Sequence, residues 1–212
     1  MQGIKAVLFD LDGTLADSLP LIRYSFQRVF QDMDIPWEDG RVMETVGLPL
    51  LEVAREYAGE QAEIFFQLYL KHQLEKHDDY IKLFPGTVEM LSRIRSRGLK
   101  TGIVTSKRRA MAERAVKITS LSGMIDVLVA LEDCCAHKPD PLPVITAMER
   151  LKSAPGETVF VGDSCYDMDS GRGAGVFTVG VTWGAADRLK LAGSSPCFIA
   201  DGWEDFIQLL EV

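Results

Sequence analysis

The sequence predicts an α/β fold in which a doubly wound, mostly parallel sheet is interrupted near its start by an all-helical insertion. Three observations support this prediction. A short apolar run near the N-terminus ends in two aspartates and a glycine. A long stretch with helical periodicity and no strand-like alternation follows it. From residue 83 onward, apolar runs typical of buried strands alternate with helical patterns to the end of the chain.

The first predicted strand is the apolar run from Ala6 to Phe9, which is typical of a strand buried on both faces of a parallel sheet. Asp10 and Asp12 follow it directly, and Gly13 allows a sharp turn and a close approach to a ligand. Because open α/β sheets bind ligands beyond the carboxyl ends of their strands, this turn is a candidate site. Taken alone, the Asp-Gly pair is equally consistent with a simple hairpin turn.

The insertion is predicted to contain three helical segments. In the first, apolar side chains recur at three- and four-residue spacing: Leu19, Ile22, Phe26, Val29, Phe30 and Met33. A second segment follows Gly47-Leu48-Pro49, and a third runs from about Gln61 to Glu75, with Ile64, Phe65, Leu68 and His72 on one side. We therefore predict a helical domain at 16–82, inserted into a core domain formed by 1–15 and 83–212.

The rest of the chain alternates between helices and strands. The predicted strands are Lys100 to Thr105, Ile125 to Val129, Thr158 to Val161, Val176 to Val181 and a short edge strand, Cys197-Phe198-Ile199. The first predicted helix in this part begins near Thr87 and ends at Gly98. The others cover Arg108 to Ile118, Pro139 to Leu151, Tyr166 to Arg172 and Trp203 to Leu210. This alternation indicates βαβ units and a mostly parallel sheet.

Composition excludes several classes of protein. With 47% apolar and 25% charged residues among 212, neither a disordered nor a fibrous chain is expected. The net charge of −8 argues against a general nucleic-acid or anionic-membrane surface. We find no signal-peptide pattern and no apolar run near the ~20 residues of a spanning helix. The four cysteines form no Cys-x-x-Cys motif, so we interpret them as reduced thiols of a cytoplasmic protein.

Three further polar clusters lie at predicted strand ends or just beyond them. They are Thr105-Ser106, Lys138-Pro139 and the run from Gly162 to Asp167. Together with the turn from Asp10 to Leu15, they resemble the four motifs of the haloacid dehalogenase superfamily of phosphohydrolases. The resemblance covers the whole chain in order and spacing, and the joint occurrence of all four motifs at strand ends is highly specific.

The charges of these residues support the resemblance. Asp10, Asp12, Asp163 and Asp167 would place four negative charges in one pocket, and like carboxylates at close range cannot all remain ionised uncompensated. Lys138 balances one of them, which leaves about three, and a phosphate substrate would add more. A hard divalent cation with oxygen ligands is therefore expected, and Mg²⁺ suits a site that leaves room for water and substrate.

The resemblance implies a role for each motif residue. Asp10 is expected to be the nucleophile that forms an aspartyl-phosphate, and Asp12 the general acid and then the base that activates water. The Thr105 hydroxyl and the Ser106 backbone N–H are expected to bind phosphate oxygens, and Lys138 to bridge the nucleophile and the phosphate.

The same resemblance implies a set of Mg²⁺ ligands. Asp10 and Asp163 would bind the ion through their side chains and Asp12 through its backbone carbonyl. Asp167 would bind it directly or through a water. The residues themselves leave simpler alternatives open: Asp163 and Asp167, four apart, could support the helix that follows, just as Thr105-Ser106 could be a helix N-cap and Lys138 a solvated loop lysine.

Other candidate motifs are interpreted as structural. Lys107-Arg108-Arg109 is expected to be a solvated surface, with attraction of an anionic substrate as the alternative. The glycine-rich run from Gly171 to Gly175 lies at a helix end and is expected to serve helix–sheet packing rather than dinucleotide binding. His72 and His77 are five apart on a helix, which makes a shared metal improbable.

The sequence thus predicts a Mg²⁺-dependent phosphatase that acts on a small phosphorylated molecule in the cytoplasm. The helical insertion containing Thr45-Val46-Gly47-Leu48-Pro49 resembles that of the phosphoglycolate phosphatase and pyrophosphatase branch, and Gly180 to Gly184 agrees with that branch. Phosphoglycolate, pyrophosphate and sugar phosphates are the expected substrate types. A phosphomutase of the same superfamily is the alternative; a haloacid dehalogenase and a non-catalytic binding module are less favoured.

The helical insertion is expected to act as a mobile cap over the pocket. Its loop around Gly47 is expected to reach the leaving group and to set specificity, so that a bulky residue there would change the ranking of substrates. The alternative is that Gly47 only forms a turn before a helix. Either a monomer or a homodimer is compatible with the sequence.

Overall fold

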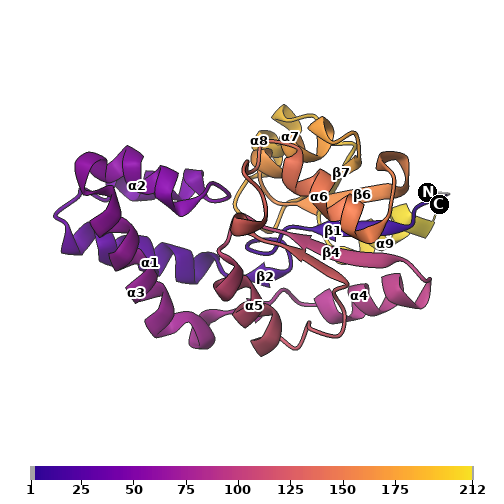
Figure 1. The fold of residues 1–212 in the computed structure, drawn as a ribbon, viewed down its shortest axis with the longest axis horizontal. Coiled ribbons are helices and arrows are strands. Elements are labelled where there is room, and N and C mark those ends of the chain that lie inside the picture. Colours follow the sequence, from indigo (N-terminus) through magenta and orange to yellow (C-terminus); the bar gives the residue numbers. More distant parts are fainter. Residues whose placement is uncertain (1–2, 212) are drawn as a thin grey trace.

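The computed structural model describes residues 3–211 and has two lobes, a sheet with helices on both faces and a smaller helical lobe (Figure 1). Within this range the main sheet has six parallel strands in the order β5-β4-β1-β6-β7-β8. Its strands are β1 (Ala6–Phe9), β4 (Lys100–Val104), β5 (Val127–Val129), β6 (Thr158–Gly162), β7 (Phe177–Val181) and β8 (Phe198–Ala200). The predicted fold class is confirmed, and β8 is an edge strand as expected.

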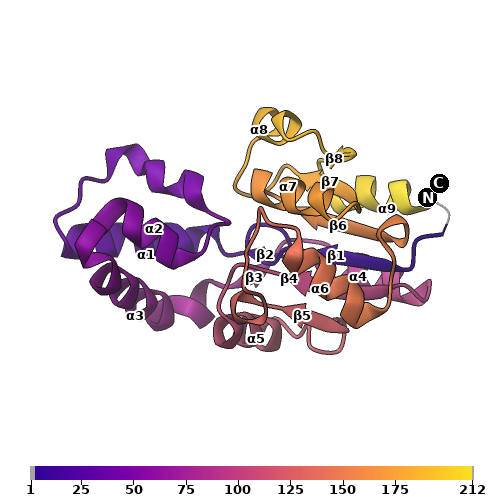
Figure 2. The same ribbon diagram turned by 45° about the horizontal axis from the view of Figure 1, so that its top comes forward.

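Helices cover both faces of this sheet (Figure 2). One face is covered by α4, α5 and α9, and the other by α6 and α7. Their bounds are α4 (Thr87–Ser96), α5 (Arg109–Ile118), α6 (Leu142–Leu151), α7 (Cys165–Gly173), α8 (Arg188–Gly193) and α9 (Trp203–Glu211), with short 3₁₀ turns η3 (Leu131–Asp133) and η4 (Pro155–Glu157) between them. Each of these helices follows a strand. A helix between two parallel strands carries the chain back to the edge of the sheet at which both strands begin.

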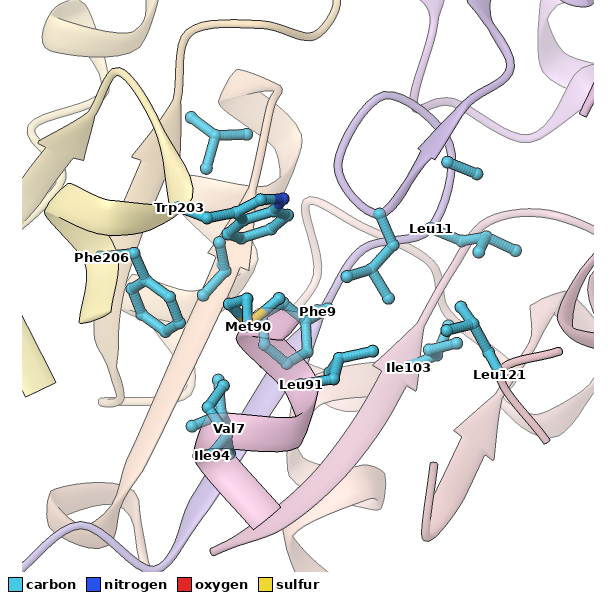
Figure 3. Packing of buried hydrophobic residues seen from close by; sticks show 14 of the residues in the cluster. Val7, Phe9, Leu11, Met90, Leu91, Ile94, Ile103, Leu121, Trp203 and Phe206 are labelled. Atoms are coloured by element: carbon cyan, nitrogen blue, oxygen red, sulfur yellow. The ribbon is translucent and has the colours of Figure 1, made fainter. Parts of the chain in front are cut away.

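The core follows from the alternation of side chains along β1. Val7 and Phe9 point to one face, where Phe9 contacts the rings of Trp203 and Phe206 edge-on at 6.0 Å (Figure 3). Ala6 and Leu8 point to the other face, against α6. Because both faces are buried, the strand reads as an unbroken apolar run instead of an alternating one.

The smaller lobe is helical. It comprises α1 (Leu19–Asp32), η1 (Glu38–Thr45), α2 (Leu50–Ala58), η2 (Gly59–Gln61) and α3 (Ala62–Tyr80), which pack around Phe26, Phe30 and Phe65. The chain enters and leaves this lobe through a two-stranded antiparallel ribbon, β2 (Ala16–Asp17) and β3 (Lys82–Leu83). The two connections therefore run side by side. The division into a core of 1–15 and 83–212 and a cap of 16–82 remains a prediction.

Several predicted boundaries are wrong by a few residues. The third helix of the insertion continues to Tyr80, and Ile64 is 55% exposed instead of lying with Phe65 on the buried side. The ribbon and α8 were missed, because two-residue strands and a six-residue helix are too short to show a period. Among residues 3–211, we find no helix long and apolar enough to cross a membrane.

Candidate active site

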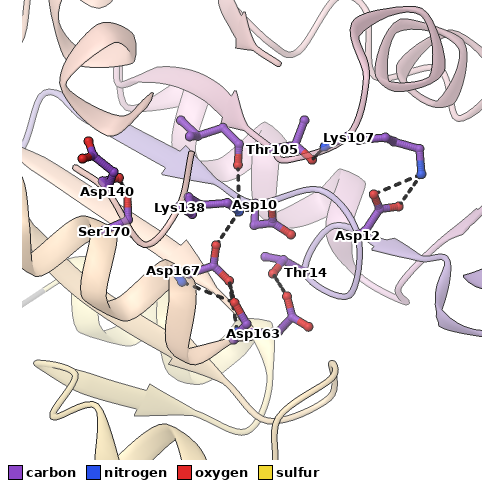
Figure 4. A network of polar contacts seen from close by, with 12 residues as sticks. Asp10, Asp12, Thr14, Thr105, Lys107, Lys138, Asp140, Asp163, Asp167 and Ser170 are labelled. Atoms are coloured by element: carbon purple, nitrogen blue, oxygen red, sulfur yellow. Dashed lines mark hydrogen bonds and ion pairs between the residues drawn. The ribbon is translucent and has the colours of Figure 1, made fainter. Parts of the chain in front are cut away.

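The candidate site lies where three neighbouring strands end. β1 lies between β4 and β6 in the sheet, so Asp10, Thr105 and Asp163, which follow these strands or end them, meet at one edge. Figure 4 shows these residues together with Lys138, which comes from the connection before α6. Residues up to 153 positions apart in the chain are thereby brought into one site by the parallel order of the strands.

Three buried carboxylates form the centre of the site. One ligand oxygen each from Asp10, Asp163 and Asp167 lies within 4.8 Å of the others. Asp163 is fixed from two sides, because Thr14 Oγ1 donates to its Oδ1 at 2.9 Å and the Ala185 backbone N–H donates to its Oδ2 at 2.7 Å. Gly13 has φ +87°, and a Cβ there would lie 2.2 Å from Asp163 Oδ2. Glycine is therefore required at this turn for the carboxylates to approach.

Lys138 lies between two of these carboxylates. Its Nζ is 2.5 Å from Oδ1 of both Asp10 and Asp167, and its side chain is 2% exposed. The other oxygen of Asp167 accepts hydrogen bonds from the backbone N–H and the hydroxyl of Ser164. This burial does not fit the alternative of a solvated loop lysine, and the role of Lys138 at the phosphate remains a prediction.

The charges at this centre do not balance. Burial raises the pKa of Asp10 well above its usual range, although the Lys138 ammonium opposes that shift. Burial and the neighbouring Asp167 raise the pKa of Asp163 to about 7. Burial by itself would lower the pKa of Lys138, but Asp10 and Asp167 outweigh it and raise this pKa. Three carboxylates with one ammonium and only oxygen donors fit a hard divalent cation.

Asp12 lies outside this cluster. Its two carboxylate oxygens accept hydrogen bonds from Lys107 Nζ at 2.8 and 3.0 Å (Figure 4). Burial by itself would raise the pKa of Asp12, but the Lys107 charge and the hydrogen bonds to this carboxylate together outweigh burial and lower the pKa. The interpretation of Lys107-Arg108-Arg109 as a solvated surface is wrong for Lys107, whose side chain is 6% exposed. The feature of the sequence that could have indicated a place in the site is that Lys107 directly follows Thr105-Ser106.

Thr105 and Ser106 line a cavity of about 100 Å³ between the two lobes. The Thr105 hydroxyl accepts a hydrogen bond from the Lys107 backbone N–H at 3.1 Å. The Ser106 hydroxyl is buried and has no hydrogen-bond partner within residues 3–211. The cavity also contacts Asp10, Asp12, Lys107 and Arg108 of the core, and Phe26, Thr45, Val46, Gly47, Leu48, Tyr69 and Gln73 of the helical lobe.

Gly47 lies on the lining of this cavity and also touches the core. With φ +108°, a Cβ at this position would lie 2.9 Å from the Tyr166 ring and 3.2 Å from Ser164 Oγ. The loop thus closes on residues next to Asp163 and Asp167. The role of this loop in specificity remains a prediction. The close packing against Tyr166 and Ser164 is a further reason for glycine at this position, and the sequence did not reveal it.

The remaining sequence candidates are structural. His72 Nε2 pairs with Asp32 Oδ2 at 2.6 Å, whereas His77 Nδ1 pairs with Asp78 Oδ1 at 2.9 Å, so the two histidines have different partners. Gly171 lies in α7, where a Cβ would lie 2.6 Å from Thr178, which fits close helix–sheet packing. All four cysteines are free thiols.

Comparisons with known proteins agree with this geometry. The family described as haloacid dehalogenase-like hydrolase matches residues 7–181. A protein of Clostridium perfringens, provisionally named the pyrophosphatase PpaX, is 40% identical over 209 residues, which are 98% of each chain. The pyrophosphatase PpaX of Oceanobacillus iheyensis is 30% identical over 209 residues, covering 99% of this chain and 98% of its own.

Two solved structures extend the comparison. A Bacteroides fragilis protein, provisionally described as a haloacid dehalogenase-like hydrolase, has a TM-score of 0.89 at 28% identity, over 96% of this chain and 99% of its own. A Lactobacillus plantarum protein, provisionally described as a phosphoglycolate phosphatase, has a TM-score of 0.88 at 26% identity, over 98% and 100% of the two chains. The resemblance seen in the four motifs is confirmed, and the chain belongs to the haloacid dehalogenase-like hydrolases, in their phosphatase branch.

Proposed function

We propose that the protein is a Mg²⁺-dependent phosphohydrolase that cleaves a small phosphorylated metabolite through an aspartyl-phosphate. The observation that carries this proposal is the position of Asp10, which directly follows β1 and lies beside two further carboxylates and the Lys138 ammonium. Relatives named as pyrophosphatases and a phosphoglycolate phosphatase support the same chemistry. A cytoplasmic location, and a monomeric or dimeric state, remain predictions of the sequence.

In the proposed reaction, an Asp10 carboxylate oxygen attacks phosphorus and forms an O–P bond while the bond from phosphorus to the leaving oxygen breaks. Asp12 gives its proton to the leaving oxygen, then takes one from the water that attacks phosphorus and releases Asp10. Thr105, Ser106 and Lys138 hold the phosphoryl oxygens and stabilise the charge that develops on them.

Asp10, Asp163 and Asp167 would hold the Mg²⁺ with the Asp12 backbone carbonyl, and water could mediate the contact with Asp167. The ion would neutralise carboxylate charge and polarise the phosphoryl group for attack. The oxygen-only donor set suits this ion, and three buried carboxylates around one ammonium leave negative charge that a divalent cation would balance.

The pairing of Asp12 with Lys107 bears on the acid step. A carboxylate paired with an ammonium is held ionised, and an ionised carboxylate has no proton to give. The proposed role of Asp12 therefore requires Lys107 to change partner when substrate binds. The cavity that both residues line provides the place for this exchange.

We further propose that the helical lobe, 16–82, closes over the core formed by 1–15 and 83–212. The ribbon of β2 and β3 is the hinge, since both connections pass through it. Contacts between the two lobes support a closed arrangement here: Lys190 Nζ pairs with Glu44 Oε1 at 3.2 Å, and Arg114 pairs with both oxygens of Asp78 at 2.8 Å. Closure would exclude water during attack, and opening would admit it afterwards.

The experiment that tests this function is a phosphate-release screen with Mg²⁺ against phosphoglycolate, pyrophosphate and sugar phosphates, repeated with EDTA. We expect hydrolysis that EDTA abolishes. Conversion of a sugar phosphate to its isomer without phosphate release would establish a phosphomutase instead. Haloacid turnover that survives EDTA would establish a dehalogenase, and an inert protein would leave only a binding role.

A further inference from the structure

A buried ammonium on the cavity wall has no assigned substrate contact in the reaction proposed above. Lys107 Nζ binds only the two oxygens of Asp12 among the described residues, so one of its three N–H groups is left over. Figure 4 shows that this pair lies apart from the cluster of Asp10, Asp163 and Lys138. A cation placed beside the proposed acid, rather than beside the nucleophile, is suited to contact the leaving group.

The helical lobe contributes two polar side chains to the same cavity. Tyr69 and Gln73 are each 5% exposed and lie four residues apart on α3, on one face of the helix. Gln73 Nε2 donates to the Tyr69 hydroxyl at 3.3 Å, and the proton of that hydroxyl has no acceptor within residues 3–211. Most of the other lining residues from this lobe are apolar, including Ile22, Phe26, Val46, Leu48, Leu50 and Val53.

The Tyr69 hydroxyl and the Lys107 ammonium both line the cavity, and each keeps one O–H or N–H group that can donate to an occupant. A negatively charged group with several oxygens would satisfy both. The cavity has a volume of about 100 Å³ and lies between the two lobes. A compact anion suits a cavity of this size.

We propose that Lys107, Tyr69 and Gln73 form a subsite for a compact, negatively charged leaving group. This inference rests on the proposed phosphohydrolase function and narrows its substrates to two chemical types, a diphosphate and a phosphorylated short hydroxy acid. Both release a group with its own negative charge. Sugar phosphates, whose leaving group is larger and neutral, are poor substrates in this reading.

Two substrates that differ only in this charge provide the test. Phosphoglycolate and 2-hydroxyethyl phosphate share a phosphoester, but a carboxylate in the first is a hydroxymethyl group in the second. We expect the wild-type kcat/KM with Mg²⁺ to favour phosphoglycolate roughly 10- to 100-fold, the range for a charge-assisted hydrogen bond. Pyrophosphate, measured alongside, shows which of the two anionic types is preferred.

The variant that removes the charge is Lys107→Met. We expect it to bring the ratio of the two kcat/KM values close to one, whereas Lys107→Arg restores most of the preference. Tyr69→Phe, which keeps the ring and loses the hydroxyl, lowers the ratio several-fold. The control is Lys71→Met, an exposed position on the same helix, whose ratio stays at the wild-type value. Thermal melting confirms that each variant is folded.

The outcomes separate this inference from the function on which it rests. A wild-type enzyme that hydrolyses both esters with similar kcat/KM overturns the subsite and leaves the phosphohydrolase intact. Equal losses on both esters in Lys107→Met also overturn it, because Lys107 would then act only by holding Asp12. A wild-type protein that hydrolyses no phosphate compound at all overturns the proposed function, and the subsite with it.

Discussion

The Nζ atom of Lys138 lies 2.5 Å from Oδ1 of Asp10, and both side chains are almost fully buried. The two residues are 128 positions apart in the chain. Their contact fixes the orientation of the proposed nucleophile and holds a positive charge where a phosphoryl group would bind. It also makes the stability of the core depend on how the neighbouring carboxylates are neutralised.

Replacing Asp10 with asparagine tests the nucleophile. We expect Asp10→Asn to lower kcat to below about one-thousandth of the wild-type value on every phosphate substrate, because an amide oxygen cannot form the aspartyl-phosphate. The fold should persist, since the change removes one of three clustered negative charges. Phosphate release and thermal melting are the measurements. Asp79→Asn, at an exposed position, is the control, and retained turnover in Asp10→Asn would refute the mechanism.

Removing the Lys138 ammonium should destabilise the metal-free protein. In Lys138→Met, Asp10 and Asp167 lose their buried cation, and such a loss typically costs about 3–5 kcal/mol. Urea unfolding at pH 8 with EDTA measures the free energy of unfolding, and Lys117→Met on the exposed side of α5 is the control. The loss should shrink at pH 5, where the carboxylates are more protonated. An equal loss at both pH values would show that packing, rather than charge, is responsible.

The pKa of Asp163 predicts how stability depends on pH without metal. Its folded-state pKa is about 7, above the usual value near 4, so the folded state binds more protons than the unfolded state between these values. Stability from this group is therefore present at low pH and falls as pH rises from about 4 to 7. Thermal melting with EDTA across this range measures the trend.

Added Mg²⁺ should reverse that trend. The ion binds the ionised carboxylates of the folded state, so the rise in melting temperature on adding Mg²⁺ should be larger at pH 8 than at pH 5. Calorimetry at pH 6 should show protons released on binding. A stabilisation that is equal at both pH values would argue against Asp163 and Asp10 as ligands.

The loop containing Gly47 makes a prediction about closure as well as specificity. Gly47→Leu should lower kcat/KM on every substrate, because a side chain at φ +108° would push the loop away from Tyr166. A change in the ranking of substrates should come in addition if the loop contacts the leaving group. Leu48→Ala, which alters the cavity lining without a positive φ, isolates that second effect. Mg²⁺ affinity should be nearly unchanged in Leu48→Ala.

Local patterns in the sequence determined the fold class and the motif residues of the site. The apolar run from Ala6 to Phe9, the helical period after it and the later alternation all depend on side-chain spacing, which is a local property. Parallel strands bring their carboxyl ends to one edge of the sheet, so the sequence alone predicts that Asp10, Asp163 and Lys138 meet there.

Only the tertiary structure decided which partner each charge takes. Lys107 appeared as one of three basic residues on a surface, yet it is buried against Asp12, because the loop after β4 lies beside the loop after β1. Tyr69 and Gln73 lie on a helix whose sequence gives no sign of the cavity it faces. Gly47 is likewise constrained by Tyr166, 119 positions away. The contacts of Tyr69, Gln73 and Gly47 depend on how the two lobes meet, and the spacing of apolar residues within either lobe does not encode that geometry.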